Sequence, residues 1–523
     1  MRLIDTAEDR VVLAPQDCSY CILSYVWGHS NFQRLKKANL DQLMIKGALQ
    51  HVDLPKTIAD AIQASKMLGE RYLWVDSLCI CQDDVLEKTF QIQRMDKIYS
   101  QSTLTIVALD QNHADGGLWR DGSGNGRSQQ TVESICGLRF ICSGPPIDAV
   151  LDSSTWIQRA WTYQEYALSR RLLFFTEYQA YYSCEKSACA EDYVHRVYGD
   201  GVQQMQCFKN DEGLHRWFEA ANYPTMWPVL LREYSKRHLT FDSDGLHAVS
   251  GVLENFSRGI EDGFLCGLPV SVLFEASMRW YASAPLRRRG PTADGEDFPS
   301  WSWVGWVGEV AYEDYEESDA ILDARVISEW ALEHCDGVLR STDLHFPSAS
   351  GRLVSPSSEE DLERAKEALR QIETGILHFK TMSAMFAVEE TCWNQFVFSN
   401  DYDCEYSGLY KVFDKDSWVG SIHLEHAVAK ELSVGLGALH EFIVLSKSGG
   451  RLQPLKVPVR PLDDDVDDVP LYSENLLEEY GCDVYNVMLV SWEEGVAFRR
   501  GIGQIHKASF EHASWALKDV KLG

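Results

Sequence analysis

Polar side chains stand directly after several apolar segments in the first 170 residues. Asp76 ends one such segment, Tyr25 and Trp27 lie at the end of another, and Gln82 and Asp83 follow the next apolar run. A carboxylate at the end of a strand either caps the following loop or faces a ligand, and both interpretations of Asp76 stay open. The chemistry expected here is therefore proton transfer or ligand binding by a carboxylate among aromatic rings.

The elements that must position these residues alternate between strand and helix. Apolar, β-prone runs at 20–27, 72–76 and 104–109 predict buried strands. Amphipathic spacing predicts helices at 54–68 and from about Glu87 to Tyr99. This order is typical of a parallel sheet covered by helices, whose ligands lie beyond the carboxyl ends of the strands. We therefore expect any pocket to be lined by Tyr25, Trp27, Asp76, Gln82, Asp83 and Arg159.

The remainder of the chain predicts two further regions. A weaker helix–strand unit contains the segment 156–165 and an apolar run at 171–175, and residues 181–290 are mostly helical by pattern. Beyond 290 the composition shifts toward strands, which predicts a mainly antiparallel domain. Its expected strands are at 302–307, 375–379, 441–445 and 485–490. We expect domains at 1–180, 181–290 and 291–523.

Charge and composition exclude several classes of protein. The 523 residues carry 49 basic and 78 acidic side chains, a net charge of −29, which disfavours binding to nucleic acid or to an anionic membrane. The sequence has neither the apolar core of a secretory signal nor a run of ~18 apolar residues that could span a membrane. Most of the 14 cysteines lie in apolar runs, which favours a reduced, cytoplasmic protein.

The usual signatures of cofactor and metal chemistry are absent. The sequence has no Gly-Lys-Ser/Thr phosphate loop and no Gly-x-Gly-x-x-Gly after a strand. Cys18 and Cys21 have the spacing of half a zinc site, but no matching pair follows and Cys21 lies in a predicted buried strand. We therefore expect neither a bound cofactor nor a metal.

Five blocks of sequence resemble, in order, those of the fungal heterokaryon-incompatibility (HET) domain. They are Ser24–Gly28, Leu54–Ala61, Tyr72–Asp84, Gln91–Tyr99 and Arg159–Arg171. The resemblance implies a role in non-self recognition in filamentous fungi, in which activation of the domain leads to growth arrest and cell death. It also implies kinship with Toll/interleukin-receptor (TIR) domains, which have a flavodoxin-like α/β fold.

The TIR relationship raises the question of an NAD-cleaving activity, because some TIR domains use a glutamate on a helix for this reaction. In this sequence the helix containing Tyr99 presents Gln91 at the place of that acid, and its mid-helix acid, Asp96, lies on a different face. An amide cannot act as a general base, so the catalytic candidates become Asp76, Glu87 and Glu165. Gln91 and Tyr99 are assigned to the ligand site with Tyr25, Trp27, Gln82, Asp83 and Arg159.

Three hypotheses about function remain. The first is a signalling module that acts through protein partners or self-association. The second is an enzyme on this scaffold that acts on a small, partly aromatic metabolite in an apolar, aromatic-lined pocket. The third is a TIR-like NAD glycohydrolase. We rank signalling first and NAD hydrolysis third because of Gln91.

Overall fold

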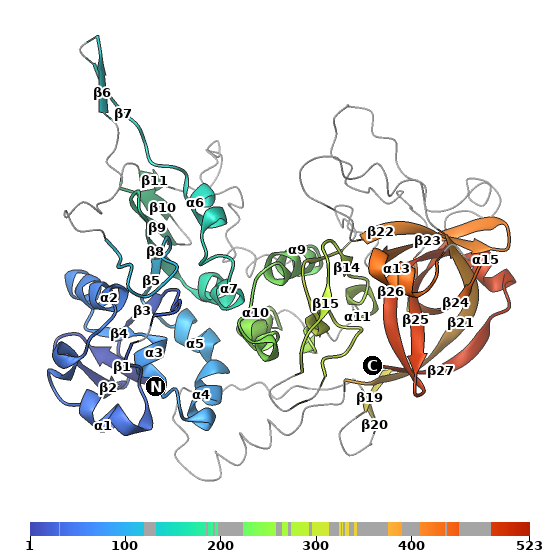
Figure 1. Cartoon of the computed structure of the whole chain (residues 1–523), viewed down its shortest axis with the longest axis horizontal. Helices are drawn as coiled ribbons and strands as arrows, with labels where there is room; N and C mark the ends of the chain where they lie inside the picture. Colours follow the sequence, from blue (N-terminus) through green and yellow to red (C-terminus); the bar gives the residue numbers. More distant parts are fainter. Residues whose placement is uncertain are drawn as a thin grey trace. The chain divides into compact units, whose positions relative to one another are not determined.

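The computed structural model describes most of both halves of the chain (Figure 1). The described residues are 1–30, 32–119, 132–136, 138–184, 187–191, 194–196, 223–257, 264–269, 274–291, 295, 297–312, 324–325, 327, 330–333, 339–341, 375–389, 407–434, 437–448 and 483–523. They form two compact units. The first holds the described parts of 1–220 together with 247–255, and the second holds those of 221–246, 256–348 and 366–523. This division into two units does not test the three expected domains, 1–180, 181–290 and 291–523, which stay a prediction.

The first unit is built on a mixed sheet of nine strands. Four central strands run parallel in the order β4-β3-β5-β8, and antiparallel strands extend both edges. The central strands are β3 (Cys21–Ser24), β4 (Tyr72–Trp74), β5 (Leu104–Ala108) and β8 (Arg171–Phe175). The edge strands are β1 (Arg2–Asp5), β2 (Arg10–Leu13), β9 (Ala180–Cys184), β10 (Ser187–Ala190) and β11 (Val194–Arg196). The expected parallel arrangement is therefore confirmed at the centre of the sheet, and its edges are antiparallel.

Helices cover this sheet because its central strands are apolar on both faces. Every residue of β3 and β5 is buried, as expected for parallel strands with helices on either side. Helix α2 (Lys56–Met67) contacts β3 and β4, while Trp156 and the buried side chains of α6 (Ile147–Ser153) pack with those of β5 and β8. Outside the segment 85–100, the other helical elements of residues 1–170 are η1 (Lys37–Asn39), α1 (Leu40–Leu43), η2 (Ala48–His51), α3 (Asp76–Cys79) and α7 (Ala160–Leu168).

The helix expected from Glu87 to Tyr99 is two helices. Helix α4 (Val85–Ile92) begins at Asp84, whose carboxylate accepts a hydrogen bond from the backbone N–H of Glu87 (3.1 Å). Helix α5 (Met95–Ser100) follows after a break at Arg94, where φ is −115° and ψ is 14°. The prediction of one continuous helix was wrong because the amphipathic pattern continues through the break. The residues of this single pattern thus belong to two helices.

Helix α10 (His247–Ser257) comes late in the sequence, but its residues 247–255 belong to the first unit. A Cβ atom on its Gly251 would lie 2.6 Å from the Cβ atom of Asp96 on α5 and 2.9 Å from Oε1 of Gln164 on α7. Both distances are shorter than ordinary van der Waals contacts. The absence of a side chain at position 251 is therefore what allows α10 to pack against these two helices.

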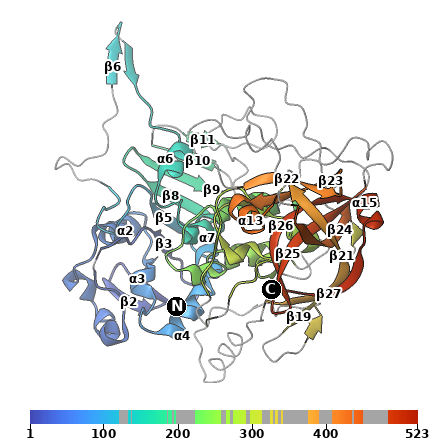
Figure 2. The same ribbon diagram turned by 45° about the vertical axis from the view of Figure 1, so that its right-hand side comes forward.

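The second unit contains a closed antiparallel barrel of six strands, seen from two directions in Figures 1 and 2. Pairing runs β21-β22-β23-β26-β25-β24 and returns from β24 to β21. The strands are β21 (Leu377–Glu389), β22 (Ser407–Asp414), β23 (Ser417–Glu425), β24 (Leu439–Ser448), β25 (Val484–Glu493) and β26 (Val496–His506). This confirms the expectation of a mainly antiparallel C-terminal region.

Apolar side chains fill the barrel. Phe386, Phe442 and Tyr485 belong to its core, and Phe510 of helix α15 (Lys507–His512) is fully buried among them. Helix α13 (His426–Glu431) contributes Ala429 to the same core. Strand β27 (Ala516–Leu522) pairs with β21 on the outside and has one parallel pairing with β26. Closure of the sheet leaves the six barrel strands without a free edge.

The rest of the second unit mixes helices with short strands. Its helical elements are α9 (Tyr223–Ser235), η3 (Asp242–Asp244), α11 (Phe274–Ser277) and η4 (Trp303–Gly305). The strands are β12 (Phe264–Leu265), β13 (Leu268–Pro269), β14 (Tyr281–Ala282), β15 (Arg287–Arg288), β16 (Trp306–Val307), β17 (Val310–Ala311), β18 (Ala324–Arg325), β19 (Trp330–Glu333) and β20 (Leu339–Ser341). The described part of 181–290 is thus mixed rather than helical throughout.

The strand expected at 302–307 is a 3-10 turn followed by β16, because the Ser302 hydroxyl accepts a hydrogen bond from Val304 N–H and caps that turn.

Among the described residues, no helix combines the length and the apolar character needed to cross a membrane.

Candidate functional site

A buried glutamate lies at the carboxyl end of β3. Glu165 comes from α7, and its carboxylate accepts hydrogen bonds from the hydroxyls of Ser24 and Tyr99. The same Ser24 hydroxyl accepts a hydrogen bond from the indole N–H of Trp156 (2.7 Å). Ser24 is the last residue of β3, and Trp156 lies in the turn before α7. The Trp156–Ser24–Glu165 chain therefore fixes a carboxylate at a strand end in the middle of the sheet.

Asp76 provides a second carboxylate at the end of the neighbouring strand, β4. Its two oxygens accept hydrogen bonds from the indole N–H of Trp27 (3.1 and 2.9 Å), and one also accepts from the N–H of Ser77 (2.6 Å). The Ser77 hydroxyl lies 2.8 Å from the phenol oxygen of the buried Tyr25. The chain turns into the short helix α3 at Asp76, which directs this side chain toward the loop after β3.

Arg159 joins the two carboxylates electrostatically. It precedes α7, and its guanidinium donates to the backbone carbonyl of Tyr25 (3.0 Å). Its positive charge acts on both Asp76 and Glu165. Two carboxylates and one guanidinium thus share the region where β3, β4 and α7 meet.

The surroundings shift the pKa of both acids upward. Burial and the charge of Glu165 raise the pKa of Asp76 to about 7, against the opposing effects of the Ser77 N–H, Arg159 and Trp27. Burial also raises the pKa of Glu165, and the hydrogen bond from Ser24, the charge of Arg159 and the hydrogen bond from Tyr99 act in the opposite direction. A pair of acids in which one titrates near neutrality is suited to general acid–base chemistry.

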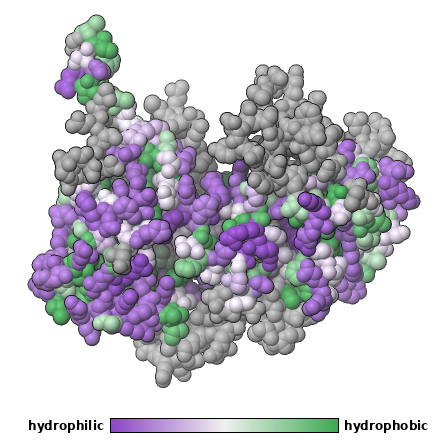
Figure 3. Space-filling view, in the orientation of Figure 1, coloured by the Kyte–Doolittle hydropathy of each residue, from purple (hydrophilic) through white to green (hydrophobic). Residues whose placement is uncertain are grey.

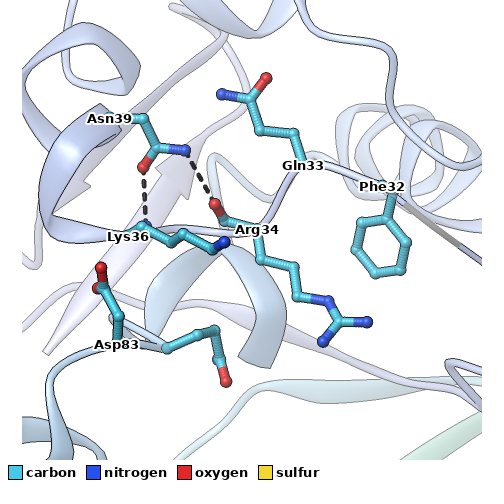
Figure 4. A pocket seen from close by; sticks show the side chains of 7 residues that line it. Phe32, Gln33, Arg34, Lys36, Asn39 and Asp83 are labelled. Atoms are coloured by element: carbon cyan, nitrogen blue, oxygen red, sulfur yellow. Dashed lines mark hydrogen bonds between the residues drawn. The ribbon is translucent and has the colours of Figure 1, made fainter.

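An open hollow of about 540 Å³ lies beside this group (Figure 4). Five residues of the segment 32–39 line it together with Gln82 and Asp83. Its Arg34 guanidinium stacks over the indole ring of Trp27, 4.5 Å from the centroid, and Trp27 also contacts Phe32 edge to face. Trp27 therefore contacts two residues that line the hollow and also donates a hydrogen bond to Asp76.

The residues of this group lie within a segment that is similar to a known family. Residues 20–165 match the family model described as heterokaryon incompatibility protein (HET). The chain carries a HET domain. One relative, heterokaryon incompatibility protein 6, OR allele, of Neurospora crassa, is 24% identical over 245 residues, which cover 40% of this chain and 34% of the relative. The match thus spans about a third of the relative's length. No solved structure matches the chain.

Most of the residues expected at the site lie together in the HET domain. The structure connects Tyr25, Trp27, Asp76, Tyr99, Arg159 and Glu165 through hydrogen bonds or charge interactions. Gln82 and Asp83 line the hollow instead, and the Gln82 amide donates to the backbone carbonyls of Asp76 (3.1 Å) and Ile80 (3.2 Å). Their roles in binding or catalysis remain predictions.

Two expected residues lie elsewhere in the HET domain. Glu87 forms an ion pair with Arg2 of β1, so the structure does not bring it into the hydrogen-bonded group around Glu165. Gln91 is 5% exposed on α4, and its side-chain oxygen has no hydrogen-bond partner among the described residues. The helix position at which the TIR comparison predicts an acid is therefore occupied by a buried amide.

Three residues of the site were not predicted to have a function. Ser24 was noted only as part of a motif, although a single serine within the apolar run 20–27 is a signal for a buried polar contact. Trp156 and Arg34 carry no such signal, because tryptophan and arginine are frequent in packing and on surfaces. Their roles depend on the contacts with Ser24 and Trp27.

Metal ligation finds no support in this part of the molecule. Within the described ranges, no three His, Cys, Asp or Glu side chains gather as metal ligands would. Cys21, Cys79 and Cys81 are free and buried, and burial raises the pKa of Cys21 to about 12 and of Cys81 to about 11. These thiols are thus packing groups with little thiolate character.

Proposed function

We propose that this protein acts in fungal non-self recognition, and that its HET domain triggers growth arrest in the cytoplasm when it meets a protein partner or a second copy. The match of residues 20–165 to the HET family model carries this proposal. The name of the Neurospora crassa relative supports the same role. The relative is matched over only part of its length, so the partner and the downstream response belong to the proposal.

An exposed apolar hairpin supports action through protein contacts. Strands β6 (Val132–Ile135) and β7 (Leu138–Ile141) form a separate two-stranded sheet, and large apolar side chains remain exposed on it (Figure 3). Ile135, Leu138 and Phe140 are 58%, 65% and 52% exposed. The register places these three on one face. An isolated hairpin with such a face is stabilised when another protein covers it.

Expression in a fungal host tests the proposal. The wild-type chain should arrest growth, and replacing Ile135, Leu138 and Phe140 together by serine should abolish the arrest if the hairpin contacts the partner. Val132→Ser lies on the opposite face of the hairpin and is the matched control. Sedimentation of the purified proteins would show whether the wild type self-associates and the triple variant does not. Growth arrest by the triple variant at wild-type protein levels would refute the role of the hairpin.

A second candidate function is hydrolysis or another acid–base reaction on a small molecule in the HET domain. The observation that favours it is the pair formed by the half-buried Asp76 and the buried Glu165 beside Arg159, with both pKa values raised. Burial is the largest cause of both raised pKa values, and perturbed pKa values of this kind gather at sites where groups transfer protons. Asp76 would then be the group that exchanges its proton near neutral pH, and Glu165 would be the second acid of the pair.

We further propose that the fold is flavodoxin- or TIR-like. Numbered along the chain, the four parallel strands have the order 2-1-3-4, which is that of the first four strands of the flavodoxin sheet. In this architecture ligands bind where the strand order reverses, between β3 and β5 here, and Ser24 ends β3 at that point. The strand order and the position of Ser24 both support a ligand site next to Glu165.

Release of nicotinamide from NAD separates a TIR-like hydrolase from the other candidates. We expect no turnover above a heat-inactivated control, because the amide of Gln91 cannot replace a carboxylate in acid–base catalysis. Turnover that is abolished by Glu165→Gln but retained in Glu87→Gln would establish NAD hydrolysis with Glu165 as the catalytic acid. Growth arrest by a chain that leaves NAD intact would favour signalling through contacts.

A further inference from the structure

The segment that forms one wall of the hollow is held firmly in place. Leu35 is fully buried, its N–H donates to the carbonyl of Ser77 (2.9 Å), and its carbonyl accepts from the N–H of Gln82 (2.9 Å). These two bonds pin residue 35 to both ends of the turn that follows Asp76. The neighbouring side chains, Arg34 and Lys36, line the hollow as a consequence.

Arg34 and Lys36 differ from the cations around them. Lys37 forms an ion pair with Asp84 (2.9 Å), Arg2 pairs with Glu87, and such pairing is expected in a chain with an excess of 29 acidic charges. Within the described part of the chain, no carboxylate lies within ion-pair distance of the Arg34 or Lys36 side chain. Both side chains line the hollow (Figure 4).

Three other polar side chains of the hollow, Asn39, Gln82 and Asp83, already have hydrogen-bond partners. The Asn39 amide accepts from the N–H of Lys36 (2.8 Å) and donates to the carbonyl of Arg34 (2.9 Å). Asp83 accepts from the N–H of Lys37 (2.8 Å) and from the Cys81 thiol (3.2 Å), and these bonds hold the pKa of its carboxyl group below the usual value. Among the described residues, the polar side chains of this hollow without a hydrogen-bond or ion-pair partner are therefore the two cations, Arg34 and Lys36, and the amide of Gln33.

We infer that the hollow binds the oxyanion group, phosphate or carboxylate, of a small anionic metabolite through Arg34 and Lys36. A guanidinium presents parallel N–H donors that fit either group, and an ammonium adds a compact positive charge. The volume of about 540 Å³ exceeds that of a single oxyanion and lies in the range of small-molecule sites. The rest of such a ligand therefore has space beside its charged group.

The position of the hollow connects this inference to the acidic pair. Arg34 stacks on Trp27, the Trp27 indole donates to Asp76, and the charge of Arg34 also acts on the Tyr25 hydroxyl. A ligand anchored at Arg34 would thus extend along Trp27 toward Asp76. Only this last step rests on the small-molecule function proposed above, because binding of the anion itself needs no catalysis.

Calorimetric titration of the full chain with pyrophosphate, and separately with malonate, tests the inference. We expect saturable binding at one site, and the preferred probe distinguishes a phosphate from a carboxylate ligand. Replacing Arg34 and Lys36 together by glutamine should weaken binding by about tenfold or more, since hydrogen bonds to charged groups contribute strongly. Asp83→Asn should tighten binding, because it removes the negative charge next to the anion while keeping an acceptor for Lys37 N–H.

The matched control removes the same charge outside the hollow. Lys37 and Lys46 pair with Asp84 and Glu8, so their replacement by glutamine should change the dissociation constant by less than about threefold at physiological salt. No saturable binding of either probe, or equal weakening by both double variants, would overturn the inference. Growth arrest by the Arg34/Lys36 variant would leave the signalling function intact, so the two proposals fail separately.

Discussion

The hydroxyl of Ser24, at the carboxyl end of β3, donates a hydrogen bond to the carboxylate of Glu165 on α7, which lies 141 residues later in the sequence. Burying a carboxylate costs free energy unless donors replace the water that it loses, and Ser24 and Tyr99 supply these donors. The same serine accepts from Trp156 and thereby ties the turn before α7 to the sheet. One hydroxyl thus supports both the fold and the proposed chemistry.

Removing this hydroxyl should destabilise the HET domain and raise the pKa of Glu165 further. Ser24→Ala leaves Trp156 without its acceptor and Glu165 with one donor fewer, which should lower the free energy of unfolding by about 1–3 kcal/mol. Urea denaturation measures this change. Ser30→Ala, which removes an exposed hydroxyl bonded to Asp115, is the control and should have little effect. Equal stability of Ser24→Ala and the wild type would contradict the assigned role of Ser24.

The pH dependence of stability should report the raised pKa of Asp76. This carboxyl group loses its proton near 3.8 when the chain is unfolded and near 7 when it is folded, so the folded state binds more protons between these values. Rising pH therefore lowers the free energy of unfolding across that window, by at most about 4 kcal/mol from this group, and the loss is complete above the folded pKa. Asp76→Asn removes the effect.

The measurement is the difference in unfolding free energy between Asp76→Asn and the wild type, followed from about pH 4 to above pH 7. As the pH rises, the variant should become progressively more stable relative to the wild type, because the variant has no proton to lose at this position. Asp83→Asn is a suitable comparison, since Asp83 is exposed and its pKa is lowered rather than raised. Parallel curves for Asp76→Asn and the wild type would show that Asp76 titrates normally.

Helix α10 should detach from the first unit when a side chain is added at its contact with α5 and α7. In Gly251→Val, the new Cβ atom would meet Asp96 at 2.6 Å, so backbone or side chains must shift at a cost of about 1–3 kcal/mol. Hydrogen exchange of 247–255 and thermal denaturation would detect the loss of packing. Glu254→Ala on the exposed side of the same helix is the control. Unchanged exchange in Gly251→Val would show that the contact with α5 and α7 is not close.

The sequence was sufficient to predict the centre of the first sheet but not the partners within the site. Strands β3 and β5 were predictable because a parallel strand buried on both faces has a continuous apolar run. The convergence of Asp76, Arg159 and Glu165 was raised only as a possibility. The partner of Ser24, for example, is Glu165, which lies 141 residues later, and the local sequence around Ser24 does not specify so distant a contact. Strand ends indicate where a site lies, whereas its hydrogen bonds depend on how α7 packs.

Two errors have the same physical origin. The break at Arg94 between α4 and α5 was missed because the apolar spacing continues through it. The strand expected at 302–307 is a capped 3-10 turn, because aromatic and apolar residues pack equally well in a buried turn. In both cases tertiary packing decides the backbone conformation of residues whose pattern fits more than one element. The closed barrel was likewise expected only as antiparallel strands, since closure depends on the pairing of β21 with β24, strands distant in sequence.

Phe510 should be essential for the stability of that barrel. It is fully buried, and its ring lies 5.5 Å from both the Phe386 and the Tyr485 rings, so α15 holds a large aromatic side chain inside the barrel core. Phe510→Ala should lower the free energy of unfolding of the second unit by about 3–5 kcal/mol, since it removes buried apolar area and leaves a cavity. Trp515→Ala, at a side chain that is 44% exposed, is the control and should cost far less. Chemical denaturation followed by near-ultraviolet circular dichroism measures both variants, and a cost below about 1 kcal/mol for Phe510→Ala would show that this end of the barrel is loosely packed.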